Sequence, residues 1–296
     1  MTLFETFVKP RLQPIFNTSF AENNIEVSLL RLDEIHPTVN GNKWFKLKYN
    51  LQYAIENNYE GIATFGGQFS NHIYSAAAAA NLLNIKSIGI VAGANPQQLS
   101  HTLLFAQEKN MQLHFVSRED YRKKNEEAQL AEWQKLFPQY CFVPEGGTNN
   151  LAVKGVGEVL NLIEADFDYI VTACGTGGTL AGLASKIKPS QKAVGISILK
   201  GEDQLTNSIK KLIGSDKNFE VITGYHFGGY AKTTDELRKF IQTFYSETGI
   251  LVEQVYTAKM LLAVIDLAKK KYFKEKSSVV LVHTGGLQGL DKSILV

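Results

Sequence analysis

Short runs of apolar and β-branched residues alternate along the chain with longer segments of helical period. Continuous apolar runs of this length, separated by helical stretches, are typical of buried strands in a parallel sheet covered by helices, and not of a sandwich. The pattern therefore predicts an α/β fold. Its expected strands are 61–65, 87–91, 112–116, 169–173, 193–198 and 279–283.

Three helical segments have simple structural interpretations. The alanine-rich segment 75–83 has high helix propensity and little bulk, which suits close packing against a sheet. Charged residues gather in 118–132, which we interpret as a solvated helix face without chemistry. The lysine run 269–271 follows an apolar helix face, where cations complement the negative end of the helix dipole.

Composition narrows the class of protein. With 296 residues and 44% hydrophobic content, the chain can bury a proper core in one large or two smaller domains, which excludes a disordered protein. The 31 basic and 29 acidic residues give a net charge of +2, so we expect no nucleic-acid partner. Cys141 and Cys174 form neither a disulfide framework nor a metal-ligand pair, which predicts a cytoplasmic protein without a structural metal.

The sequence shows no segment that suggests a membrane location. No apolar run approaches the roughly 20 residues of a membrane span, and the charged residues Glu5, Lys9 and Arg11 interrupt the first dozen positions. We therefore expect neither an export signal nor a membrane anchor.

The segment 174–182, CGTGGTLAG, joins the expected strand 169–173 to a helical stretch. Its glycines permit close backbone approach, its threonines add hydroxyls, and the helix start offers free amides and a positive dipole end. We expect an anion here, most simply a phosphate, with a tight turn that binds nothing as the alternative. The dinucleotide fingerprint fails because its third glycine falls on Leu180.

The segment 66–71, GGQFSN, repeats this arrangement before the alanine-rich helix. On this segment alone, the favoured interpretation is that Ser70 or Asn71 caps the helix.

The segment 40–48, NGNKWFKLK, is a turn leading into a helix that carries Lys43, Lys46 and Lys48. Lysines at a helix start usually face solvent. A lysine becomes a covalent catalyst when burial or a neighbouring cation lowers its pKa. Lys46 lies three positions after Lys43 on the same helix face, so it is a candidate for that cation.

In this order, the three segments resemble the tryptophan synthase β-like (fold type II) pyridoxal-phosphate enzymes. The closest group contains 1-aminocyclopropane-1-carboxylate (ACC) deaminase and D-cysteine desulfhydrase. Their GGNK motif is matched by 41–43 with Asn40 in place of the first glycine, and their late VY and HTGG motifs by 255–256 and 283–286. The correspondence runs from Arg31 to the region of Leu290, nearly the whole chain.

The resemblance implies pyridoxal 5'-phosphate as cofactor and a small amino acid as substrate. Lys43 would bind the cofactor covalently and act as the general base once released, and Lys46 is the family's second lysine. Asn71 would bind the phenolic oxygen, and Ser70 would contact the substrate carboxylate or carry a proton. Tyr256 and, on a looser alignment, Tyr230 would approach the reacting carbon, although Tyr230 could equally be a core aromatic. The phosphate would bind Gly175, Thr176, Gly177, Gly178 and Thr179.

The partner of the pyridine nitrogen separates the two subfamilies. Where ACC deaminase has a glutamate after the VY tyrosine, this chain has Thr257, and Thr284 matches the desulfhydrase-like threonine of the HTGG turn. A neutral hydroxyl makes the ring a modest electron sink, which suits β-elimination better than ring opening. We therefore expect D-cysteine desulfhydrase-like chemistry that yields pyruvate, sulfide and ammonia.

Three alternatives stay open: an ACC deaminase, a lyase of the L-serine or L-threonine dehydratase kind, and a non-catalytic relative that binds the cofactor. The resemblance also implies two open twisted, mostly parallel sheets flanked by helices, and a homodimer. A large domain would comprise 1–51 and 148–296, a small domain would comprise 52–147, and the cofactor would lie between them.

Overall fold

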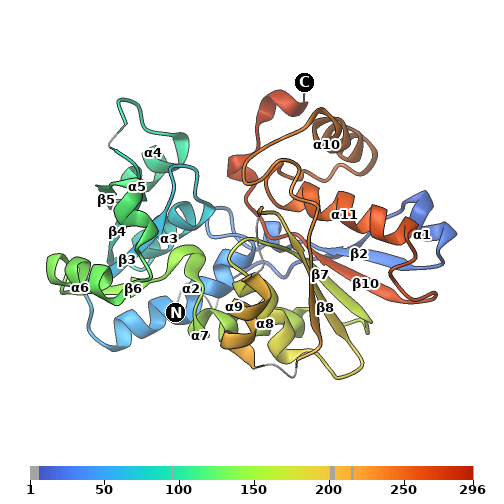
Figure 1. Cartoon of the computed structure of the whole chain (residues 1–296), viewed down its shortest axis with the longest axis horizontal. Coiled ribbons are helices and arrows are strands. Elements are labelled where there is room, and N and C mark those ends of the chain that lie inside the picture. Colours follow the sequence, from blue (N-terminus) through green and yellow to red (C-terminus); the bar gives the residue numbers. More distant parts are fainter. Residues whose placement is uncertain (1–6, 95, 201–203, 215–216, 296) are drawn as a thin grey trace.

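The computed structural model describes residues 7–94, 96–200, 204–214 and 217–295, which form two sheets flanked by helices (Figure 1). The larger sheet has the strand order β1-β2-β10-β7-β8-β9, and its strands are parallel except for the antiparallel pair β1–β2. Its strands are β1 (Leu12–Pro14), β2 (Glu26–Leu30), β7 (Tyr169–Cys174), β8 (Lys192–Ser197), β9 (Phe219–Ile222) and β10 (Ser278–Val282).

The smaller sheet has the order β5-β4-β3-β6 and is parallel throughout. Its strands are β3 (Gly61–Gly66), β4 (Lys86–Ala92), β5 (Met111–Val116) and β6 (Tyr140–Val143). All four lie inside 52–147, where the sequence analysis expects the small domain; the domain boundaries themselves stay a prediction. The α/β fold with two mostly parallel sheets is confirmed.

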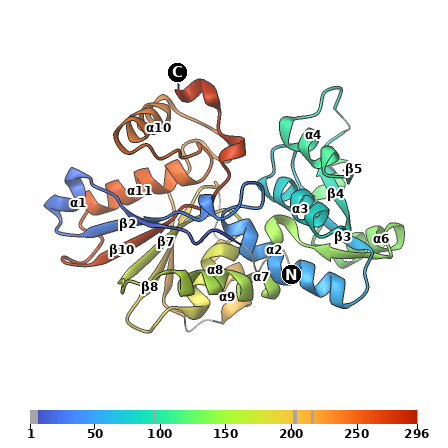
Figure 2. The same cartoon turned by 180° about the vertical axis from the view of Figure 1, so that it is seen from behind.

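Helices cover both faces of the large sheet (Figures 1 and 2). Helices α1, α10 and α11 pack over one face, and α8 and α9 lie on the other. The helices are α1 (Thr18–Glu22), α2 (Asn42–Glu56), α3 (Asn71–Leu82), α4 (His101–Glu108), α5 (Arg118–Arg122), α6 (Glu127–Leu136), α7 (Asn150–Gly157), α8 (Gly178–Lys186), α9 (Leu205–Ile213), α10 (Asp235–Thr248) and α11 (Thr257–Lys269). Within the described ranges, none of them is long and apolar enough to cross a membrane.

All six predicted strands are present, each within one residue at either end. The sequence analysis missed β1, β2, β6 and β9, which are short or carry polar residues such as Glu26 and Glu220. The alanine-rich helix begins earlier than predicted, at Asn71. The charged segment 118–132 contributes to two helices, α5 and α6, whereas the sequence analysis expected a single helix face.

Candidate functional site

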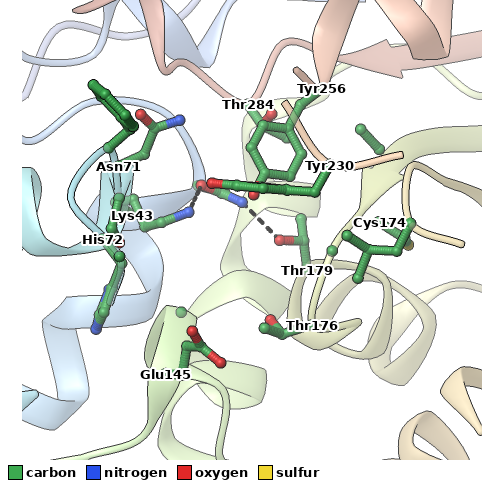
Figure 3. Close-up of a pocket in the computed structure, with 18 of the residues that line it drawn as sticks. Lys43, Asn71, His72, Glu145, Cys174, Thr176, Thr179, Tyr230, Tyr256 and Thr284 are labelled. Atoms are coloured by element: carbon green, nitrogen blue, oxygen red, sulfur yellow. Dashed lines mark hydrogen bonds between the residues drawn. The ribbon is translucent and has the colours of Figure 1, made fainter. Parts of the chain in front are cut away.

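A cavity of about 500 Å³ opens where segments of both sheets meet (Figure 3). Its wall contains the start of α2, the loop before α3, the loop after β7, and single side chains from the C-terminal third of the chain. Eleven residues predicted from the sequence line it: Lys43, Lys46, Ser70, Asn71, Gly175, Thr176, Gly177, Thr179, Tyr230, Tyr256 and Thr284. The structure therefore brings together segments that lie far apart in the sequence.

Lys43 reaches the cavity because the first turn of α2 is docked on the turn near the C-terminus. Gly41 has a φ of +63°, and a Cβ there would lie 1.9 Å from the carbonyl oxygen of Thr284, so only glycine fits. The Lys43 Nζ donates to Asn42 Oδ1 at 2.9 Å, and Asn42 Nδ2 donates to Thr179 Oγ1 at 2.8 Å (Figure 3). A hydrogen-bonded chain thus joins the lysine to the glycine-threonine loop.

Burial lowers the pKa of Lys43 to about 8, while the nearby charge of Glu253 acts in the opposite direction. The sequence analysis suggested Lys46 as a neighbouring cation with this effect, but the structure assigns the shift to burial. Lys46 Nζ donates to Gly146 O at 2.9 Å and to Thr148 Oγ1 at 3.2 Å. Burial lowers the pKa of Lys46 as well, and the charge of Lys43 lowers it further.

The start of α8 has the chemistry of a phosphate site. Gly177 is in the left-handed region with a φ of +80°, and the free amides of the helix follow it. A Cβ on Gly178 would lie 2.6 Å from Thr148 Oγ1 and 3.0 Å from Lys46 Nζ, so this side of the loop admits no side chain. Amides, the paired hydroxyls of Thr148 and Thr176 at 2.6 Å, and one lysine together fit a dianion.

The predicted residue Gly178 lies against Thr148 and Lys46 of this site, where a side chain would not fit. Its contact with the phosphate stays a prediction.

The start of α3 faces the same cavity. Ser70 is the N-cap, as the sequence analysis favoured, and its Oγ accepts from Ile73 N at 3.2 Å. An accepting hydroxyl keeps its own proton for donation into the cavity. Asn71 Oδ1 accepts from Gln288 Nε2 at 2.7 Å, so the amide is fixed from the C-terminal side of the chain.

Tyr230 and Tyr256 lie together at the cavity wall, with ring centroids 6.2 Å apart and planes at 72°. Burial raises the pKa of both hydroxyls, and a hydrogen bond between them raises that of Tyr256 and lowers that of Tyr230. Tyr230 is 48% exposed, so the alternative of an ordinary core aromatic is wrong.

Glu253 is a residue that the sequence analysis missed. It is 1% exposed, and its carboxylate accepts from the backbone N–H groups of Val255, Tyr256 and Thr257 at 2.7 to 3.1 Å. It thus caps α11 and fixes Tyr256 at the start of this helix. An acidic residue just before an apolar helical segment was the signal that could have found it.

The two threonines predicted for the pyridine nitrogen lie in different places. Thr284 lines the cavity, whereas Thr257 is fully buried in the first turn of α11 and does not reach the cavity wall. Its backbone N–H is held by the Glu253 carboxylate at 2.7 Å, which places it behind Tyr256. Of the two threonines, Thr284 is therefore the one that faces the cavity, and the contact of either with the pyridine nitrogen stays a prediction.

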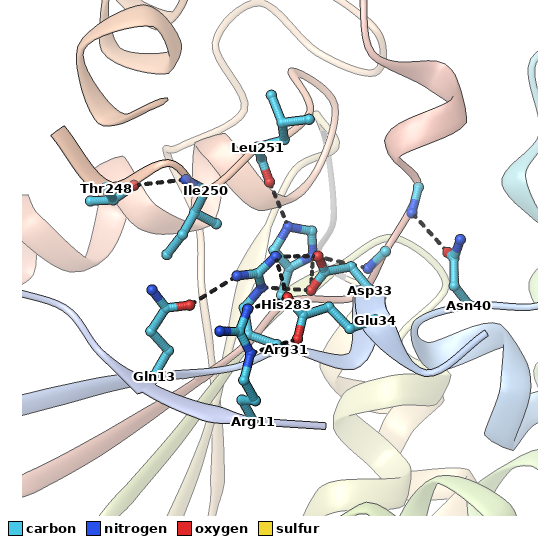
Figure 4. A network of polar contacts seen from close by, with 12 residues as sticks. Arg11, Gln13, Arg31, Asp33, Glu34, Asn40, Thr248, Ile250, Leu251 and His283 are labelled. Carbon is cyan, nitrogen blue, oxygen red and sulfur yellow. Dashed lines mark hydrogen bonds and ion pairs between the residues drawn. The ribbon is translucent and has the colours of Figure 1, made fainter. Parts of the chain in front are cut away.

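A buried network holds the turn that carries Thr284 (Figure 4). His283 Nε2 donates to Leu251 O at 2.8 Å, and its Nδ1 accepts from Gly285 N at 3.2 Å. Burial lowers the pKa of His283, which suits this neutral form. Asp33, which approaches the ring, is held by a bidentate pair with Arg31 at 2.9 and 2.7 Å.

The predicted solvated segment also contributes to the cavity, because Arg118 and Tyr121 line it together with Glu145. Tyr121 donates to Glu145 Oε1 at 2.6 Å, and Lys124 pairs with the same carboxylate at 3.2 Å. These contacts cannot be seen in the sequence, because only folding brings the partners together. The interpretation of 118–132 as a purely solvated face is therefore wrong.

Comparison with known proteins agrees with this chemistry. Residues 12–285 match the family described as pyridoxal-phosphate dependent enzymes. A putative ACC deaminase from Pyrococcus horikoshii is 29% identical over 90% of this chain and 86% of its own length. A bifunctional D-cysteine desulfhydrase/ACC deaminase from Arabidopsis thaliana is 28% identical over 90% of this chain and 74% of its own.

Solved structures show the same fold. An ACC deaminase homologue superposes with a TM-score of 0.80 and 28% identity over 95% of this chain and 90% of its own. A hydrogen sulfide-producing enzyme from Fusobacterium nucleatum superposes with a TM-score of 0.67 over 96% of this chain and 97% of its own. At 15% identity, the second similarity concerns the fold alone.

Proposed function

Since this chain belongs to the pyridoxal-phosphate dependent enzymes, with pyridoxal 5'-phosphate as cofactor, we propose that it degrades a small amino acid to a 2-oxo acid and ammonia. We propose D-cysteine as the substrate, with pyruvate, sulfide and ammonia as the products of its β-elimination. When bound, the cofactor supplies an electron sink for the substrate's α-carbon.

The observation that carries this choice is that the described residues of the cavity wall offer the hydroxyl of Thr284 and no free carboxylate to the pyridine nitrogen. Glu145 is the acidic residue among the described residues that line the cavity. Its carboxylate already accepts a hydrogen bond from Tyr121 and pairs with Lys124. Glu253 is buried behind the wall with its oxygens on backbone amides. A neutral partner leaves the pyridine nitrogen without a stabilised proton, and a weaker electron sink suffices for β-elimination.

Two helix starts give the cavity two places for anions. The start of α8, with Lys46 and the threonine hydroxyls, suits the cofactor's phosphate. The start of α3, with the Ser70 hydroxyl, is left for the substrate carboxylate. Lys43 lies with them in the same cavity wall, and an amine with a pKa of about 8 can take the α-proton near neutral pH.

ACC deamination is the second candidate. It is favoured by the Tyr230–Tyr256 pair, because two hydroxyls whose pKa values are raised stay protonated and can donate protons to a ring-opened carbon. Both relatives described above are named for ACC deaminase, and the one from Arabidopsis thaliana is also named for D-cysteine desulfhydrase.

The experiment measures pyruvate, sulfide and 2-oxobutyrate with D-cysteine, L-cysteine, L-serine and ACC supplied separately to the cofactor-loaded protein. Sulfide and pyruvate from D-cysteine, in preference to the other three, support the proposal. Turnover of L-serine alone indicates a dehydratase, and 2-oxobutyrate from ACC indicates the second candidate. Cofactor binding without turnover of any of them indicates a non-catalytic relative.

A matched pair of variants tests the role of Lys43. We expect Lys43→Ala to abolish turnover, whereas Lys48→Ala on the same helix, which removes an ion pair with Glu158, leaves turnover near the wild-type rate. Full turnover in Lys43→Ala would remove this lysine from the mechanism.

A further inference from the structure

Lys259 is a fully buried lysine for which the proposed chemistry has no use. It lies in the first turn of α11, three residues after Tyr256, and has 0% exposure. Its Nζ donates to two backbone carbonyls, those of His226 and Gly229, both at 2.9 Å. A buried ammonium needs such partners, because an unpaired charge in the interior is strongly unfavourable.

Both carbonyls belong to the loop between β9 and α10, the loop that carries Tyr230. The loop is built from two consecutive turns, in which Gly229 N donates to His226 O at 3.0 Å and Lys232 N donates to Gly229 O at 3.2 Å. Lys259 therefore binds the accepting carbonyl of each turn, and Tyr230 follows directly after the second one.

This loop has an unfavourable backbone of its own. Phe227 and Ala231 have positive φ values of 48° and 54°, and Gly228 and Gly229 lie at 94° and 118°. A non-glycine residue in this region is unfavourable and persists only where its surroundings hold it. The beginning of the loop has a separate connection to a later part of α11, because Tyr225 Oη donates to Asp266 Oδ2 at 2.6 Å. The part of the loop next to Tyr230 is connected to α11 by Lys259.

Lys259 and Tyr256 belong to the same helix start, which the buried Glu253 caps. A lysine that holds the Tyr230 loop to this helix start also fixes Tyr230 relative to Tyr256. The two rings have their centroids 6.2 Å apart and their planes at 72°. We propose that Lys259 is a positioning residue, whose ammonium holds Tyr230 against Tyr256 at the cavity wall by binding the two turn carbonyls.

The functional part of this inference rests on the proposed function, in which both tyrosines face the substrate. Misplacement of a reacting group by about 1 Å can cost on the order of 100-fold in rate. We therefore expect Lys259→Met, which keeps most of the length of the side chain and removes its donors, to lower kcat by about that factor with a smaller change in KM.

A double-mutant cycle separates positioning from general destabilisation. If Lys259 acts through Tyr230, Tyr230→Phe lowers kcat in the wild type but has little further effect in Lys259→Met. Independent, multiplying losses in the double variant would overturn the proposal. Lys269→Met is the matched control, because Lys269 is exposed at the other end of the same helix, and its kcat should equal that of the wild type.

A readout that needs no turnover is amide hydrogen exchange in the cofactor-loaded protein, followed in peptides that cover 223–234. We expect Lys259→Met to accelerate exchange there by roughly tenfold or more, since each lost hydrogen bond to a charged donor weakens the loop. Amide hydrogen exchange in α8 and the thermal unfolding midpoint of Lys259→Met should stay near the values of the Lys269→Met control. Unchanged exchange in 223–234 would refute the assignment. If the methionine variant does not fold, Lys259→Gln, which keeps a shorter donor, gives the same test.

The two proposals fail in distinguishable ways. Absence of turnover with every amino acid tested counts against the proposed function, and the exchange measurement still decides whether Lys259 holds the loop. Turnover that persists in Lys259→Met with a rigid loop counts against the positioning role alone.

Discussion

The lowered pKa of Lys43 makes a measurable difference to the reactivity of its amine. At pH 7, an amine with a pKa of about 8 is neutral in about 10% of molecules, whereas an ordinary lysine near 10.4 is neutral in about 0.04%. The structure therefore predicts an uncharged, nucleophilic fraction about 200-fold larger at Lys43 than at an exposed lysine. Burial is the cause, so this property should exist before the cofactor binds.

The assay is competitive acetylation of the cofactor-free protein over pH 6 to 11, with each lysine followed by mass spectrometry. Labelling of Lys43 should rise with pH and reach half its maximum near pH 8. Glu253→Gln removes a charge that raises the pKa of Lys43, so its profile should move to lower pH. A Lys43 profile that coincides with that of the exposed Lys269 would refute the reasoning.

The same shift predicts a pH dependence of stability. Because the unfolded chain binds the Lys43 proton more tightly than the folded protein does, folding becomes more favourable as pH rises from about 8 to about 10.4. Relative to Lys43→Met, the cofactor-free wild type should gain up to about 3 kcal/mol of unfolding free energy across this window. Urea unfolding of both proteins at each pH measures the difference.

Three further predictions follow from the contacts around the cavity and below it. Gly178→Ala should weaken cofactor binding by at least about tenfold, because the new Cβ would press on Thr148 and Lys46; equilibrium dialysis of the cofactor measures this. Lys46→Met should increase the dissociation rate of the cofactor, because it removes the cation at the phosphate site. The increase should be larger for pyridoxal phosphate than for unphosphorylated pyridoxal, and stopped-flow transfer to a scavenger measures both rates. Asp33→Asn should lower the free energy of unfolding by about 1.5 to 3 kcal/mol, because it removes the bidentate partner of the buried Arg31 and leaves Glu34, at 3.1 Å, as its carboxylate; a loss below about 0.5 kcal/mol in urea unfolding would contradict this.

The sequence predicted the parts of the fold and site that depend on local patterns. The central strands are continuous apolar runs, and glycines at strand–helix junctions mark the loops 66–71 and 174–178 that face the cavity. The edge strand β9 was missed because Glu220 within it interrupts the apolar pattern and pairs with Lys192 on β8.

The missed site features depend on contacts between distant segments. Lys46 faces Gly146 because α2 packs beside the loop after β6, 100 positions further along the chain. Glu145 and Tyr121 come from two separate segments, and each looks like an ordinary surface residue in sequence. Glu253 was the exception, since its position before α11 is a local capping signal.

The position of β10 has a consequence for how the protein is made. Glu26 of β2 pairs with Ser278 of β10, 252 positions further along the chain, and β10 also pairs with β7 in the middle of the large sheet. As the ribosome elongates the chain, the small sheet can assemble from one contiguous stretch, but β2 waits for β10 until about 250 further residues have been added. Such distant pairing slows folding and leaves an apolar strand edge uncovered in the nascent chain. Removal of the last 20 residues should therefore yield an insoluble product, whereas the segment forming the small sheet has all its strand partners long before synthesis ends.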